Sequence, residues 1–475
     1  MTRKFAIIAV SLAAFALLAV GCNFAPKYQR PSVETPDAFK DAASWKPAQP
    51  KDDARRGNWW ELFGDPKLNA LEEQVNVSNQ NVLQAEAQYR EAKAAVGVAR
   101  AALSPIVTTA PGATFAGGAS STASSTGASG SRKSFTLPVN ISWEPDLWGN
   151  IRRGVTASSA TAQSLAANVG NARLLYQAEL AQDYFLLHGN DGEAALLART
   201  EASYQEYVTL TGTRVSAGVA SDLDVAQAET QLYAIQSQLM DLGVERAAFE
   251  HAIAILIGKA PADLTIPPVM LKTVPPSVPL GVPSELLERR PDIASAERQV
   301  AAANEQIGIA IAAFYPNLSL TGGGGLESSS LAKWFTWPSR FWAVGAQLAD
   351  TLFDAGRRRG VVAEQQAAYD ATVAAYRETV LTAMQQVEDN LAALRILAGE
   401  ADKVQQTIQA ANRALEISSA QYRSGTVDYL AVITAQATLL SADVTAVTLL
   451  TRRLSASVLL IEGLGGGWNA SQFPK

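Results

Sequence analysis

Long stretches of this sequence carry small and apolar residues at helical spacing, with few prolines or glycines to interrupt them. One stretch covers residues 65–103, and two much longer ones cover residues 146–216 and 354–424. Each longer stretch predicts a helix that reaches about 100 Å at a rise of about 1.5 Å per residue. In the first of these two helices, the helical pattern is weakest at residues 189–192. Alanine on more than one face indicates neighbours on both flanks. The pattern favours a tube of helices, with a solid coiled-coil rod as the alternative.

Segments between these helices alternate apolar and polar residues with the period of two that is typical of strands. Residues 134–143 show this alternation clearly, and residues 342–348 repeat it with weaker contrast. Their expected partners are residues 106–115 and 317–325. The sequence therefore predicts two hairpins, over about 106–145 and about 316–352, joined internally by surface loops.

Strands of about ten residues with one apolar and one polar face match those of membrane barrels. Tryptophans cluster near the strand ends, where interfacial aromatic residues belong: Trp143, Trp148, Trp334, Trp337 and Trp342. Four strands cannot close a barrel, for which about eight is the smallest number. Since unpaired strand edges are prohibitive in lipid, several copies must share one barrel, and three copies would supply about twelve strands.

The two halves of the chain repeat one pattern, which indicates an internal duplication. Residues 81–105 match residues 292–316, and the Arg-Arg-Gly-Val at 152–155 recurs at 358–361. We therefore divide the chain into segments by residue number: a first repeat over 65–260, a proline-rich linker over 261–283, a second repeat over 284–463 and a tail over 464–475.

The N-terminus has the pattern of a targeting signal. Arg3 and Lys4 precede an apolar run over residues 5–20, which is short for a membrane span of about 20 residues. The run ends in Leu-Leu-Ala-Val-Gly-Cys at 17–22. This resembles a lipobox, although Ala19 stands where such motifs usually carry leucine. An ordinary signal peptide followed by a chance cysteine is the alternative.

The resemblance to bacterial lipoproteins implies a signal peptide over 1–21 and a covalent lipid on Cys22, the one cysteine of the chain. Several acyl chains on that residue would anchor the protein stably. Asn23 follows in place of the Asp that commonly marks inner-membrane retention, which implies sorting to the outer membrane. Residues 22–64 are then a lipid-anchored, extended segment.

Composition and motifs argue against an enzyme. A single cysteine excludes an internal disulfide and a cysteine zinc cluster, and the two histidines, His188 and His251, lie in apolar helical patterns typical of packing. Neither a Gly-x-Ser-x-Gly nor a His-Glu-x-x-His motif occurs, and Gly322–Gly325 lacks the following Lys-Ser/Thr of a phosphate loop. The net charge of −6 gives no attraction to nucleic acid. We expect no catalytic residue, no metal and no cofactor beyond the lipid.

Several short motifs occur in order along this duplicated frame. They are Pro26-Lys27-Tyr28, Trp-Trp-Glu-Leu-Phe-Gly-Asp-Pro at 59–66, Glu-Pro-Asp-Leu-Trp-Gly at 144–149, Leu-Glu-Arg-Arg-Pro-Asp-Ile at 287–293, Phe-Asp-Ala-Gly at 353–356 and Leu-Gly-Gly-Gly-Trp at 464–468. Together they resemble the TolC/OprM-type outer-membrane efflux proteins, lipoprotein (NodT) branch.

That resemblance implies a mainly α fold with membrane β structure. Three copies would form a twelve-strand β-barrel, four strands per protomer, continued by a twelve-helix α-barrel in the periplasm. It also implies docking to a periplasmic adaptor protein and an inner-membrane pump, so that this protein is a passive exit duct for drugs or other small molecules. A TolC-like duct for type I protein secretion is one alternative, and a non-conducting structural coiled-coil lipoprotein is another.

The two helical hairpin tips, near residues 215–225 and 424–433, are the expected periplasmic aperture. Gly218 and Gly425 suit positions just after a helix, and Ser221 with Asp224 fits an N-terminal capping box. Asp428 occupies the position of Ser221 in the second tip. Capping alone is the simpler interpretation of Ser221 and Asp428, while adaptor contact through Gly218, Ser221 and Gly425 is the functional one.

The family resemblance places a constricting leucine ring at Leu430 and a polar ring one turn later at Thr434. Relatives commonly carry Asp at that second position, so Thr434 is a departure that argues against an acidic ring there. Asp222, Asp224 and Asp428, repeated in three copies, would still give a negative mouth, and such carboxylate rings favour cations.

Overall fold

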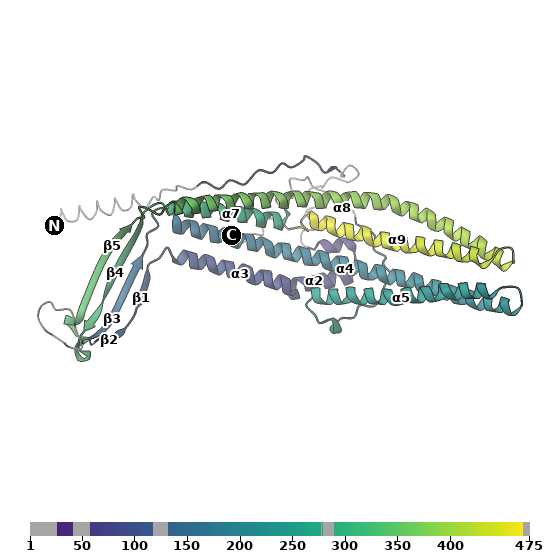
Figure 1. The fold of residues 1–475 in the computed structure, drawn as a ribbon, viewed down its shortest axis with the longest axis horizontal. Coiled ribbons are helices and arrows are strands. Elements are labelled where there is room, and N and C mark those ends of the chain that lie inside the picture. The colour runs from purple at the N-terminus through teal and green to yellow at the C-terminus, as the bar shows by residue number, and fades with distance from the viewer. Residues whose placement is uncertain (1–25, 41–57, 117–131, 277, 279–288, 469–475) are drawn as a thin grey trace. The chain divides into compact units, whose positions relative to one another are not determined.

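The computed structural model describes residues 26–40, 58–116, 132–276, 278 and 289–468 (Figure 1). The predicted signal peptide, Cys22 and parts of the linker and tail lie outside these residues. The chain divides into two compact units. The strand-bearing unit comprises residues 1–31, 90–164 and 296–375, and the helical unit comprises residues 32–89, 165–295 and 376–475.

Helices make up most of the described chain, and their order repeats. The 67-residue helices α4 and α8 are each followed by a 35-residue helix, α5 and α9 respectively. The bounds of the α-helices are α2 Pro66–Ser78, α3 Gln80–Ala101, α4 Asn150–Ser216, α5 Asp222–Leu256, α7 Pro291–Ala312, α8 Arg357–Arg423 and α9 Tyr429–Gly463; the short 3₁₀ turns are η3 Trp59–Phe63, η4 Pro261–Asp263, η6 Leu331–Lys333 and η7 Trp337–Ser339. The matching lengths confirm the predicted duplication.

The first predicted helix is wrong in one respect, because it breaks at Asn79 into α2 and α3. The Asn79 side-chain oxygen accepts hydrogen bonds from the backbone N–H groups of Asn81 and Val82, at 3.0 and 3.1 Å, and so caps α3. Its side-chain amide donates to the carbonyl of Leu256 at the end of α5, at 2.8 Å. A contact with a residue far along the chain therefore fixes this break.

Residues 189–192, predicted to be the weakest point of the first long helix, lie inside an uninterrupted α4. Gly189 packs closely against α9, since a Cβ built there would lie 2.4 Å from Thr451 Oγ1. The glycine thus permits close helix packing. His188 and Asp191, also on this turn, are buried and lie 3.0 Å apart between His188 Nδ1 and Asp191 Oδ2.

The strands form one antiparallel sheet in the order β1/β2–β3–β4–β5. The strands are β1 Ile106–Thr109, β2 Gly112–Ala116, β3 Arg132–Trp143, β4 Asn317–Ser328 and β5 Arg340–Ala349. Both β1 and β2 pair with β3, so they form one interrupted arm of the first hairpin. Gly322–Gly325 lies within β4, as the absence of a phosphate-loop continuation predicted. The predicted hairpins are confirmed.

One face of this sheet is apolar, as the period of two predicted. In register, Val107 lies opposite Ile141, Ile141 opposite Gly322, and Gly322 opposite Val344. Trp342 and Val344 on this face are 80% and 77% exposed in the single chain. Among the described strands, β5 and the β1/β2 arm each pair on one side only. The sheet therefore has an exposed apolar face and two open edges.

Among the described helices, α9 is long and apolar enough to cross a membrane, judged by length and composition alone. Its most apolar 18-residue window has a mean hydropathy of 1.5, and 28% of that window is buried. The buried face packs within the helical unit, where Tyr429 contacts the rings of Tyr207 on α4 and Tyr422 on α8. Several apolar side chains of α9, among them Leu439, Leu440 and Val444, are only partly covered by this one chain, while its fully exposed positions are mostly polar.

The carboxyl group of Glu72 on α2 is buried without a hydrogen-bond partner in the described part of the chain, and this burial predicts how the stability of the protein depends on pH. Its side chain is 0% exposed, and neither carboxylate oxygen has a hydrogen-bond partner among the described residues. Burial raises its pKa well above the ordinary value of 4.5. The folded state thus holds this proton more tightly than the unfolded state. The contribution of Glu72 to the free energy of unfolding is therefore complete below pH 4.5 and is lost as the pH rises through the raised pKa of the folded state.

We expect Glu72→Gln to raise the midpoint of thermal unfolding at pH 8, because the variant never has to ionise a buried carboxyl. The advantage should shrink towards pH 4. The control is Glu73→Gln, which changes an exposed neighbour on the same helix. Circular dichroism melts of the purified protein across this pH range would make the measurement. An equal midpoint shift at pH 4 and pH 8 would contradict the assignment.

Candidate functional site

The turns that join α4 to α5 and α8 to α9 lie side by side at one end of the helical unit (Figure 1). Gly218 and Gly425 follow the long helices with φ angles of 75° and 76°, a left-handed conformation that favours glycine. Backbone hydrogen bonds from Val219 to Arg214 and from Thr426 to Gln421, both 3.0 Å, close the two turns. The predicted helix-terminating role of both glycines is confirmed.

Both following helices begin with the predicted caps. Ser221 and Asp224 form a reciprocal capping box at the start of α5. Asp428 caps α9 by accepting a hydrogen bond from the backbone N–H of Ala431 at 3.3 Å. Asp222 lies in the first turn of α5, where a negative charge interacts favourably with the helix dipole. The simpler interpretation of Ser221 and Asp428 is confirmed, while their part in an aperture or in adaptor contact stays a prediction.

A cluster of aromatic residues that the sequence pattern did not predict joins the two tips. Tyr429 is fully buried, with its ring centroid 5.5 Å from those of both Tyr207 and Tyr422. Val432 and Ile433 on α9 and Ala228 on α5 complete the apolar cluster. All four helices that reach the tips therefore meet in one core directly behind the turns.

Arg214 is a second contact between the tips that the sequence did not reveal. Its guanidinium donates a hydrogen bond to the carbonyl of Tyr422 at 2.9 Å and lies over the Tyr422 ring, 4.5 Å from the centroid. Charge-assisted hydrogen bonds and cation–π contacts are among the stronger individual interactions at a partly exposed site. This residue ties the end of α4 to the end of α8.

The two residues predicted to form the constriction lie on one exposed face of α9. Leu430 is 54% exposed, and Thr434, one turn later, donates its hydroxyl to the Leu430 carbonyl at 2.8 Å. The same exposed face continues through Thr438, Ser441, Thr445, Thr448 and Arg452. Predicted aperture residues are thus continuous with a long stripe of mostly uncharged polar side chains.

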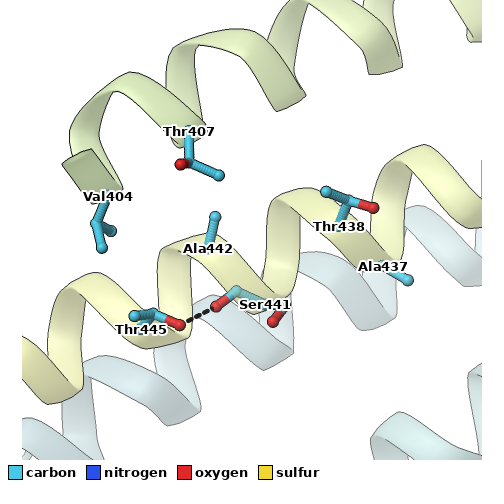
Figure 2. A pocket seen from close by; sticks show the side chains of 7 residues that line it. All are labelled: Val404, Thr407, Ala437, Thr438, Ser441, Ala442 and Thr445. Carbon is cyan, nitrogen blue, oxygen red and sulfur yellow. Dashed lines mark hydrogen bonds between the residues drawn. The ribbon is translucent and has the colours of Figure 1, made fainter.

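Part of this stripe borders a cavity of about 470 Å³ between α8 and α9, which Figure 2 shows with its lining residues. Thr438, Thr445 and Thr407 donate their hydroxyls to carbonyls one turn earlier on their own helices, at 2.8, 2.6 and 3.0 Å. The lining therefore carries no charge, and its threonine donors are already used.

The described residues contain no group of three or more His, Cys, Asp or Glu side chains arranged to hold a metal ion. The predicted tip residues fall into two sets. Ser221, Asp222 and Asp224 lie together on one tip, and Asp428, Leu430 and Thr434 lie together on the other.

Comparisons with known proteins agree with this arrangement. A family model described as outer membrane efflux protein matches residues 71–259 and 282–466. The outer membrane protein OprJ of Pseudomonas aeruginosa is 31% identical over 477 residues, covering 97% of this chain and 96% of its own. The toluene efflux pump outer membrane protein TtgC of Pseudomonas putida is 30% identical over 462 residues, covering 97% and 95%. The solvent efflux pump outer membrane protein SrpC of Pseudomonas putida is 30% identical over 483 residues, covering 97% and 99%.

Solved structures show the same likeness. The outer-membrane channel OprN has a TM-score of 0.87 at 29% identity, covering 94% of this chain and all of its own. The Campylobacter jejuni CmeC outer membrane channel has a TM-score of 0.88 at 24% identity, covering 95% and 96%. The second likeness concerns the fold alone.

Replacing Arg214 with Gln should loosen the contact between the tips, because it removes both the charged hydrogen bond and the cation–π contact to Tyr422. We expect amide hydrogen exchange at residues 423–428 to accelerate by about tenfold or more, the equivalent of about 1.4 kcal/mol of local opening. Arg199→Gln, elsewhere on α4, is the control. Unchanged exchange at the second tip would show that Arg214 does not hold it.

Proposed function

The chain belongs to the outer membrane efflux protein family and is the outer-membrane channel component of an efflux system; we propose that three copies of it form a passive duct for small molecules. One observation carries the assembly, namely the sheet with an apolar face and two open edges. Such a sheet is unstable in lipid until further strands close it. Family membership supports three copies and about twelve strands, enough for a barrel.

Helix α9 supports the same assembly. Apolar side chains on its flanks, among them Leu439, Leu440 and Val444, are only partly covered within one chain, although its packed face is well buried. Neighbouring copies in a ring of helices would cover the flanks and leave the polar stripe from Leu430 to Arg452 facing the lumen. Uncharged hydroxyls along that stripe suit conduction, because a duct that bound its cargo tightly would slow its release.

Small molecules are the cargo that the relatives favour. The names of TtgC and SrpC refer to toluene and solvent. We infer that this chain likewise exports compounds of low molecular mass, in preference to the proteins of a type I secretion system. The channel acts without catalysing a reaction, and the energy comes from an inner-membrane pump joined to it by a periplasmic adaptor. Gly218, Ser221 and Gly425 on the exposed tips are the proposed adaptor contacts.

Retention at the outer membrane has a second proposed component, the lipid on Cys22. The sequence at 17–22 supports this modification, and the outer-membrane placement of the family fits it. The anchor would hold the N-terminal segment at the membrane surface while the strands cross the bilayer.

The proposed aperture predicts that Leu430→Ala raises leak conductance several-fold in planar bilayers, because each copy loses an exposed apolar side chain from the constriction. Ile396→Ala is the control, since it removes a similarly exposed apolar side chain, 58% exposed, from α8 at a position far from both tips. Conductance that stays at the wild-type value would remove Leu430 from the gate.

The lipid anchor predicts a definite mass for the mature protein. Intact-mass spectrometry should find a chain that begins at Cys22 and carries diacylglyceryl and acyl groups. Cys22→Ser should abolish the added lipid mass. Because the variant has no lipid anchor, much of the unassembled protein should no longer be bound to the membrane. A mature wild-type chain that begins at another residue, or that lacks lipid, would contradict the assignment.

A further inference from the structure

A second cavity, of about 440 Å³, lies in the helical unit among α4, α5, α8 and α9. It differs from the threonine-lined cavity in carrying both charge and large apolar side chains. Its apolar lining includes Leu186, Phe249, Leu397, Val447 and Leu459, and its polar lining includes Asn190, Glu193, Glu245 and Arg452. Cavities of about 300–1,000 Å³ with a mainly apolar wall and a few polar groups are typical of small-molecule sites.

Asn190 orients one of the carboxylates at this cavity. The side chain is only 8% exposed, and its amide donates to Glu245 Oε2 at 3.3 Å. The hydrogen bond from the Asn190 amide therefore holds the Glu245 carboxylate at the wall of the cavity.

Two carboxyl groups from different helices share the same wall. Burial, and then the charge of Glu245, raise the pKa of Glu193 above its ordinary value. Arg452 on α9 also lines the cavity, while Asn390 is the polar residue that α8 contributes. With both carboxyl groups ionised, the two negative charges exceed the one positive charge, and a bound cation would relieve their repulsion.

We propose that this cavity binds amphipathic organic cations with N–H donors. The flat apolar body of such a molecule would lie against Phe249 and the aliphatic wall. Its cationic end would donate to the carboxylates of Glu245 and Glu193. An anion would meet the excess negative charge, and no group of three or more His, Cys, Asp or Glu side chains among the described residues is placed to hold a metal ion.

The site goes beyond the duct function, because it is complete within one chain and needs no aperture. Thr448 and Arg452 of its lining continue the exposed stripe of α9 that begins at Leu430. A solute that follows this stripe would therefore reach the site. The close packing of Gly189 on Thr451 holds α4 against α9 and fixes the position of Asn190 beside it.

The test uses the full chain in nanodiscs of zwitterionic lipid and proflavine, a three-ring cation with two amino groups, followed by fluorescence anisotropy. 9-Anthracenecarboxylate, a three-ring anion, is the counter-probe, and empty nanodiscs correct for partition into lipid. We expect saturable binding of proflavine and no saturable binding of the anion. The Glu193→Gln/Glu245→Gln double variant should bind proflavine at least about tenfold more weakly than the wild type, since it loses charge-assisted hydrogen bonds.

Two further variants test the apolar wall and the specificity of the charge effect. Phe249→Ala should weaken binding through the apolar wall without changing charge, and Glu206→Gln, an exposed carboxyl elsewhere on α4, should leave binding unchanged. Lowering the pH should weaken proflavine binding in the wild type, beginning at a higher pH than an ordinary glutamate would give, because the pKa of Glu193 is raised.

Equal binding of cation and anion, or unchanged affinity in both the double variant and Phe249→Ala, would overturn the proposal. So would the absence of saturable proflavine binding to the wild type. Single-channel conductance of the same variants reports separately on the duct. Loss of binding with intact conductance would support the site, and a wild type that binds but does not conduct would refute the duct alone.

Discussion

Unpaired strand edges in a lipid bilayer are the constraint on which this protein depends. Water is absent from the hydrocarbon core, so every open N–H and C=O group there costs several kcal/mol. One chain supplies β1/β2, β3, β4 and β5 in a sheet that pairs internally but ends in two open edges. The apolar face that includes Trp342 and Val344 suits lipid, yet the edges do not. Assembly with further copies satisfies both the face and the edges, and it would also complete the cover of the half-buried apolar side chains on the flanks of α9.

The helical unit combines firm packing along its length with a smaller set of contacts at its tips. Asn79 joins α2 and α3 to the end of α5, and Gly189 lets α4 pack tightly on α9. At the tips, by contrast, the two turns are held by a small tyrosine cluster and by Arg214. So small a set of contacts fits the proposed aperture, which must be able to open. The polar stripe of α9 runs from the proposed aperture residue Leu430 past both cavities.

The sequence predicted those features that depend on local pattern. Alternation over residues 134–143 located β3, and the spacing of Ser221 and Asp224 located a helix start, because both signals involve residues close together in the chain. It failed where distant residues decide the structure. The break at Asn79 depends on Leu256, the role of Gly189 depends on Thr451, and Arg214 meets Tyr422 across 208 positions. The charged cavity was likewise invisible, since its lining comes from four helices of both repeats.

The most direct test of the account is the stoichiometry of the full-length protein in a bilayer. Native mass spectrometry of the chain released from nanodiscs should give three copies, and the same preparation should conduct in planar bilayers. A single chain that spans the bilayer stably by itself would contradict the account, because its open strand edges would then require no partner.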